Sequence, residues 1–191
     1  MRIKIFDNMA LCTDEEVQRM LPLVSAQRRE QALRYKHTFG RFCCLKSWLM
    51  LQELIGPFAY WQYNEHGKPF IEGGPFFSIS HCKTGIAVAV SDEPIGIDVE
   101  HIRTADKSLI ERTMNADEQQ HIQSDRDFTR LWTQKEAVVK WQGTGIESFE
   151  QLQTILSKSR DHETASPQIE TFENENYIYS IAYGKLHCFR A

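Results

Sequence analysis

The chain has 191 residues, 41% of them hydrophobic and 25% charged, with a formal net charge of −4 at pH 7. This length suits one or two small domains that bury enough core to fold alone. The negative charge argues against general affinity for nucleic acid, and no apolar run is long enough to span a bilayer. The five cysteines form no C-x-x-C pair, which is typical of reduced thiols, so we expect a cytoplasmic protein.

The first part of the chain combines one strand with helices. Residues 2–6 alternate apolar and polar side chains, as a strand does. A capping-box pattern at residues 13–16 predicts the start of one helix, and Ser25 predicts the start of the next. Apolar side chains three or four residues apart predict a longer helix over residues 39–55, and we expect its aromatic and aliphatic stripe in the core.

A basic island covers the second and third of these helices. Between residues 28 and 46 a single acidic residue, Glu30, accompanies six basic ones: Arg28, Arg29, Arg34, Lys36, Arg41 and Lys46. Such an island is either the solvated face of a helix or a binding site for a phosphorylated small molecule.

In the centre of the chain, apolar and polar side chains alternate as they do in strands. Alternating segments separated by turn residues predict strands over residues 60–63, 68–72, 76–81, 85–90 and 95–100. We expect the segment 95–100 to pair back on 85–90, so that the centre forms a meander of antiparallel strands.

Helical patterns return in the second half. A second capping box at 115–118 and a run of helix formers over 128–141, ending near Gly143, predict two helices. A polar loop over 157–166 and strands over 177–183 and 185–190 follow. Helices followed by antiparallel strands, twice over, predict an α+β fold with two α+β halves.

The segment 95–100 carries two carboxylates on one face. Side chains alternate across a strand, so Asp98 and Glu100 share a face with Gly96, with their Cα atoms roughly 7 Å apart. Two such carboxylates suit a hard cation such as Mg²⁺. The alternative is an edge strand with a charged face in solvent.

The helix over 128–141 brings a third carboxylate. Trp132, Glu136 and Lys140 are four residues apart and therefore share one helix face. Glu136 and Lys140 are either a salt-bridged surface pair or, if this helix packs on the segment 95–100, Glu136 is a third ligand for the same cation.

Four motifs, in this order and spacing, resemble the Sfp-like group of 4′-phosphopantetheinyl transferases. They are G-K-P at 67–69, F-S-I-S-H at 77–81, G-I-D-V-E at 96–100, and W-x-x-K-E-A-x-x-K at 132–140. The resemblance implies two similar α+β halves in a pseudo-twofold arrangement, with antiparallel sheets packed with helices. The halves would be residues 1–100 and 101–191, with the active site at their junction.

The resemblance also implies an activity. Members of this family transfer the phosphopantetheine arm of coenzyme A to a serine of an acyl or peptidyl carrier protein and release 3′,5′-ADP. By motif, Asp98, Glu100 and Glu136 resemble the Mg²⁺ ligands, Glu136 resembles the residue that deprotonates the serine, and Lys140 balances charge in the transition state. A chain with both halves needs no second copy to build its cleft, so we expect a monomer.

The positions that resemble coenzyme A contacts are spread over both halves: Arg28, Arg41, Lys68, Ser80, His81, Lys135 and Lys140. The sequence departs from the family pattern at two positions: Gln31, where relatives can carry a basic residue, and Cys82, where they usually carry serine. His81 could instead be a half-buried histidine, and Lys68 a turn lysine in solvent. A non-catalytic coenzyme A or nucleotide binding module is the alternative function.

Overall fold

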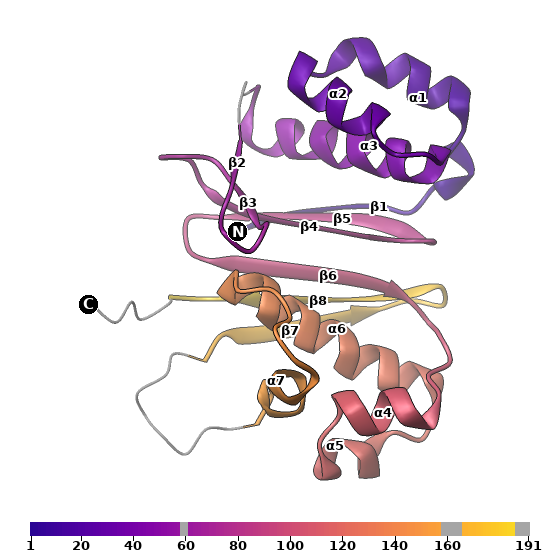
Figure 1. Ribbon diagram of the computed structural model, residues 1–191, viewed down its shortest axis with the longest axis vertical. Helices are drawn as coiled ribbons and strands as arrows, with labels where there is room; N and C mark the ends of the chain where they lie inside the picture. The colour runs from indigo at the N-terminus through magenta and orange to yellow at the C-terminus, as the bar shows by residue number, and fades with distance from the viewer. Residues whose placement is uncertain (58–60, 158–165, 186–191) are drawn as a thin grey trace.

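The computed structural model describes residues 1–57, 61–157 and 166–185, which are arranged in stacked layers (Figure 1). Its helices are α1 (Asp14–Met20), α2 (Ala26–Leu33), α3 (Thr38–Ile55), α4 (Lys107–Thr113), α5 (Ala116–His121), α6 (Asp125–Gln142) and α7 (Phe149–Thr154). Its strands are β1 (Arg2–Phe6), β2 (Gln62–Tyr63), β3 (Pro69–Phe70), β4 (Phe76–Cys82), β5 (Gly85–Ser91), β6 (Ile95–His101), β7 (Gln168–Glu173) and β8 (Tyr177–Tyr183).

The helices start where the sequence supplies capping side chains. The hydroxyl oxygens of Thr13 and Ser25 accept the backbone N–H groups of Glu16 and Arg28, each at 3.2 Å. Asn115 and Glu118 form the predicted capping box at the start of α5. The helix predicted over 128–141 begins slightly earlier, at Asp125, and ends at a glycine in the left-handed conformation as predicted.

The antiparallel strands form two three-stranded sheets and one small hairpin. The first sheet has the order β1-β5-β4, the second the order β6-β8-β7, and β2 pairs with β3. The predicted α+β fold with antiparallel sheets packed with helices is therefore confirmed. The pseudo-twofold relation and the division at residue 100 stay predictions.

The predicted pairing of the segment 95–100 with 85–90 is wrong. Strand β6 pairs with β8 instead, with Asp98 opposite Ser180. The reason is that β6 needs cover on both faces: Ile97 and Val99 pack against the first sheet, while the other face lies on α6. Strand β5 also has no free edge, because β1 and β4 pair with it on either side.

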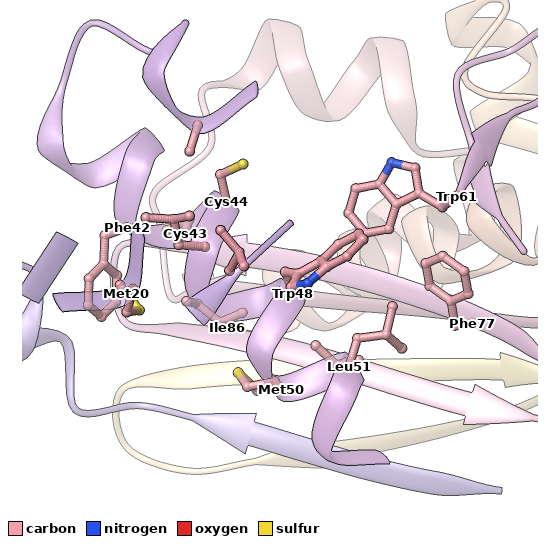
Figure 2. Close-up of a cluster of buried hydrophobic side chains, with 14 of the residues drawn as sticks. Met20, Phe42, Cys43, Cys44, Trp48, Met50, Leu51, Trp61, Phe77 and Ile86 are labelled. Carbon is pink, nitrogen blue, oxygen red and sulfur yellow. The ribbon is translucent and has the colours of Figure 1, made fainter. Parts of the chain in front are cut away.

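Three apolar layers hold the stack together. The largest lies between α1–α3 and the first sheet, where Phe42, Trp48, Phe77 and Ile86 meet, so the predicted core stripe of α3 is confirmed (Figure 2). A second layer joins the inner faces of the two sheets. A third joins α6 to β8 through Ala137, Val138, Trp141 and Ala182.

Gly96 sets the distance between β6 and α6. A Cβ atom at this position would overlap the carbonyl oxygen of Ala137 and the amide nitrogen of Trp141. Only glycine lets the strand carrying two carboxylates lie this close to the helix carrying the third.

Several predicted segments are shorter than expected or lie outside the described residues. The hairpin strands β2 and β3 have two residues each. Most of the predicted loop over 157–166, residues 186–190 of the predicted strand over 185–190, and residue 60 are outside the described part of the chain. In that part, no helix is both long and apolar enough to cross a membrane.

Candidate active site

A cavity of about 280 Å³ opens where β4, β6 and α6 come together. Its lining is Ile79, Ser80, His81, Asp98, Glu100, Glu136 and Lys140. The structure therefore brings the three predicted carboxylates together with Lys140, Ser80 and His81. Strand β6 is at the edge of its sheet, as the alternative interpretation had it, but its acidic face is not in solvent, because Gly96 and Asp98 are buried against other elements.

Asp98 is the most deeply buried of the three carboxylates, with 3% of its surface exposed. Its Oδ1 accepts hydrogen bonds from Ser80 Oγ at 2.8 Å and from Lys140 Nζ at 2.6 Å. Its Oδ2 is buried and has no hydrogen-bond partner among residues 1–57, 61–157 and 166–185. A buried carboxylate oxygen without a partner is costly, so this atom is suited to bind a ligand.

Glu100 and Glu136 flank Asp98 and are harder to ionise than ordinary carboxyl groups. Burial, and then the negative charge of Asp98, raise the pKa of Glu100 to about 7. The same two causes raise the pKa of Glu136. The positive charges of Lys140 and Arg103 oppose both shifts. An added cation would favour the ionised form of both carboxyl groups by offsetting the charge of Asp98.

The donor set fits a hard divalent cation. Three carboxylates on one cavity wall, one with an unpartnered buried oxygen, are the ligand type that Mg²⁺ prefers. The side chains do not yet converge: in the described part of the chain, no three acidic, histidine or cysteine side chains are placed to enclose a metal ion. On one side of Asp98 the neighbouring group is the ammonium of Lys140 and not a second carboxylate.

Lys140 joins the two sheets at this cavity. Its ammonium donates to Ser80 Oγ of the first sheet at 3.0 Å and to Asp98 of the second. The predicted Glu136–Lys140 surface pair is absent from the ion pairs between described residues, where Lys140 pairs with Asp98. The ammonium is therefore fixed at the cavity wall.

A second cavity, of about 200 Å³, shares Ile79 and His81 with the first and reaches Arg28. Arg28 is buried, and burial lowers the pKa of its guanidinium. Nε donates to Cys44 O at 3.0 Å and Nη1 to Gln31 Oε1 at 2.8 Å. The guanidinium carbon also lies 4.0 Å from the ring centroid of Trp61. Arg28 therefore reaches this cavity with its Nε and Nη1 donors already engaged.

His81 lies between these two cavities. Its exposed ring makes an edge contact with Phe39, the centroids being 5.9 Å apart, so it is not the half-buried histidine of the alternative interpretation. Cys82, the next residue, is buried between the sheets, which separates its thiol from the imidazole. Arg41 lines neither cavity, and its Nε donates to Tyr35 O at 2.9 Å.

Lys68 borders a third cavity, of about 220 Å³, which shares Ile79 and Lys140 with the first. Its ammonium donates to the carbonyls of Lys140 at 2.5 Å, Ile95 at 3.2 Å and Trp141 at 3.4 Å. Burial lowers the pKa of Lys68 to about 8. Lys68 is therefore a cap on the last turn of α6 and no turn lysine in solvent.

Lys135, like Arg41, is a predicted site residue that lies away from the carboxylates and from these cavities. Its side chain is fully buried, and its ammonium donates to Glu118 Oε2 at 2.7 Å and to Leu152 O at 2.5 Å. These partners belong to α5 and α7, and Lys135 lines none of the three cavities described above.

Arg103 is a charged neighbour that sequence reasoning missed. Its guanidinium carbon lies 4.8 Å from the ring centroid of Trp132, and its charge acts on Glu100 and Glu136. The sequence did carry a signal for this contact. Arg103 follows Glu100 by three residues, and Trp132 precedes Glu136 by one helical turn.

Comparisons with known proteins agree with this fold. Residues 94–187 match the model of the 4′-phosphopantetheinyl transferase superfamily. This stretch includes the three carboxylates and both lysines of α6. The resemblance to the Sfp-like 4′-phosphopantetheinyl transferases that the motifs predicted is thereby confirmed.

Curated relatives extend the match into the first half. The chain is 29% identical over 147 residues to 4′-phosphopantetheinyl transferase psf-1 of Bacillus pumilus, covering 69% of this chain and 63% of that protein. It is 30% identical over 143 residues to gsp of Aneurinibacillus migulanus, covering 68% and 60%. With Sfp of Bacillus subtilis the identity is 27% over 153 residues, covering 70% and 66%. The chain thus spans less than two thirds of the length of these relatives.

Proposed function

We propose that this protein transfers the 4′-phosphopantetheine arm of coenzyme A to a serine of an acyl or peptidyl carrier protein and releases 3′,5′-ADP. The observation that carries the proposal is one cavity wall with Asp98, Glu100, Glu136 and Lys140, in a chain whose residues 94–187 match this transferase superfamily. The names of its relatives support the same activity.

Asp98, Glu100 and Glu136 would hold Mg²⁺. The ion, when bound, neutralises the pyrophosphate and its leaving group. The unpartnered Oδ2 of Asp98 and the raised pKa values of the two glutamates support this assignment. Ser80 and Lys140 orient the Asp98 carboxylate by donating to its other oxygen.

Glu136 would take the proton from the incoming serine. A general base works best when its pKa lies near the working pH, and burial moves the pKa of Glu136 in that direction. Lys140, held at the same wall, would stabilise negative charge on the departing phosphate.

Coenzyme A would lie along the cavities that share Ile79. Contacts from Arg28, Ser80, His81 and Lys68 are supported by their places in the lining. Arg41 stays a predicted contact outside that lining. We further propose a monomeric, cytoplasmic enzyme that binds neither nucleic acid nor membranes.

A panel of apo carrier proteins from fatty-acid, polyketide and peptide synthesis tests the proposal. Each carrier is incubated with the protein, coenzyme A and Mg²⁺ and then weighed by mass spectrometry. We expect at least one carrier to gain the mass of the phosphopantetheine arm. No gain on any carrier, with a known transferase as positive control, would contradict the proposed activity.

A non-catalytic coenzyme A binding module is the second candidate. It is less well supported, because three neighbouring carboxylates repel one another and a pyrophosphate unless a cation is present. Such a module would bind coenzyme A but would modify no carrier, whether or not Mg²⁺ is present.

A further inference from the structure

The buried ammonium of Lys135 ties three helices together. It lies on α6 with none of its side chain exposed, and it donates to Glu118 of α5 and to the carbonyl of Leu152 on α7. A buried lysine is stable only when its charge is paired and its donors are used. Both conditions are met inside the protein, by groups that belong to neighbouring helices.

Glu118 is equally committed to this contact. Its Oε2 accepts the backbone N–H of Asn115 at 2.8 Å as part of the capping box, and the same oxygen accepts Lys135 Nζ. Asn115 in turn donates its side-chain amide to Gln153 O of α7 at 3.1 Å. The start of α5 and the end of α7 are therefore fastened to each other and to one point on α6.

The opposite side of α6 is fixed by Gly96. There the backbone of β6 touches the backbone of α6 at Ala137 and Trp141. Successive helical residues point about 100° apart, so a helix held at Lys135 on one side cannot rotate without moving Glu136. The direction of the Glu136 carboxylate is thereby coupled to the Lys135–Glu118 ion pair.

We propose that Lys135 is a positioning residue: it fastens α5 and α7 to the back of α6, fixes the rotation of that helix, and makes no contact with coenzyme A. The effect on catalysis by Glu136 rests on the proposed function. The attachment of α5 and α7 to α6 by Lys135 does not. This assignment differs from the phosphate contact implied by the family resemblance. A phosphate could reach this ammonium only after the three helices had separated.

Three variants separate the two assignments: Lys135→Met, Glu118→Gln and the double variant. Glutamine preserves the capping box, so Glu118→Gln removes only the charge of the pair. We expect Lys135→Met to lower Tm by about 10 °C, since it leaves a buried carboxylate without its counter-ion. The double variant should lose much less than the two single losses combined, because the partners act as a unit. Lys107→Met, at a lysine with 89% side-chain exposure, is the matched control and should shift Tm by less than about 2 °C.

Binding and turnover are measured well below every Tm. We expect the Kd of coenzyme A to stay within about twofold in all three variants, while kcat falls at least tenfold in Lys135→Met because Glu136 is misdirected. Amide hydrogen exchange should accelerate in α5 and α7 in this variant and remain unchanged in the Lys107→Met control.

Other outcomes overturn the proposal. A Kd of coenzyme A raised tenfold or more by Lys135→Met, with Glu118→Gln unaffected, would establish the phosphate contact. Additive Tm losses would show that no pair exists, and a normal kcat in folded Lys135→Met would remove the positioning role. If the wild-type protein neither binds coenzyme A nor modifies a carrier, the proposed function fails, while Tm coupling and hydrogen exchange still decide whether Lys135 fastens the helices.

Discussion

Replacing Gly96 by alanine should separate the carboxylates of β6 from that of α6. The added methyl group meets the carbonyl oxygen of Ala137 and the amide of Trp141, which are backbone atoms and cannot turn aside as a side chain can. Overpacking of this kind costs up to about 3 kcal/mol, which corresponds to a fall in Tm of about 6–12 °C for a chain of this size.

Gly96→Ala should also lower kcat, and by more than the loss of folded protein accounts for. A displacement of α6 by about 1 Å moves Glu136 and Lys140 relative to Asp98, and a misplacement of that size can lower kcat about 100-fold. The Kd of coenzyme A should change little, because Arg28 and His81 lie on other elements.

Gly85→Ala is the matched control for this experiment. It also adds a methyl group to a strand glycine, but its nearest neighbour is Phe6 O at 3.2 Å, so a shift of a few tenths of an ångström suffices. Thermal unfolding and carrier modification are measured on both variants. A Gly96→Ala protein with wild-type Tm and kcat would refute the argument that this contact sets the strand–helix distance.

Three further predictions follow from the charged groups of the site. Glu136→Gln should lower kcat by about 10²–10⁴-fold while coenzyme A still binds in calorimetry; a lost kcat together with lost binding would count against its role as a base. Lys140→Met should lower kcat by about 10²-fold or more in the carrier assay, and full activity would exclude a role in stabilising the leaving group. Lys68 has a pKa of about 8 in the folded protein, below its ordinary value of 10.5. Between these two pH values the folded state binds fewer protons than the unfolded state, so the free energy of unfolding rises with pH. Urea unfolding measures this effect: from pH 8 to pH 10 the free energy of unfolding of the wild type should rise, relative to that of Lys68→Met, by on the order of 2 kcal/mol. Parallel pH profiles for the two proteins would contradict the prediction.

The carboxylate site was predictable because its spacing is local. Alternation along a strand places Asp98 and Glu100 on one face, and helical spacing places Glu136 and Lys140 on another. The motif order then suggested that the two faces meet, and the structure lines one cavity with all four residues.

Partner choice over long distances was not predictable in the same way. Pairing of β6 with β8 depends on which element covers each face of the strand, and alternation is the same whichever neighbour it has. The destinations of Lys68 and Lys135 also depend on packing: one caps α6 and the other binds Glu118, while the sequence presents both as lysines in a phosphate-binding motif.

The pairing of Asp98 with Ser180 also has a consequence for synthesis on the ribosome. When Asp98, Glu100 and Glu136 have emerged from the exit tunnel, the strand that carries two of them still lacks its hydrogen-bonded neighbour, which is translated much later. The nascent chain can assemble α1–α3 on the first sheet before then, because all of those residues precede residue 92. The proposed active site should therefore be complete only after β8 has left the ribosome, although its three carboxylates are all translated before that strand.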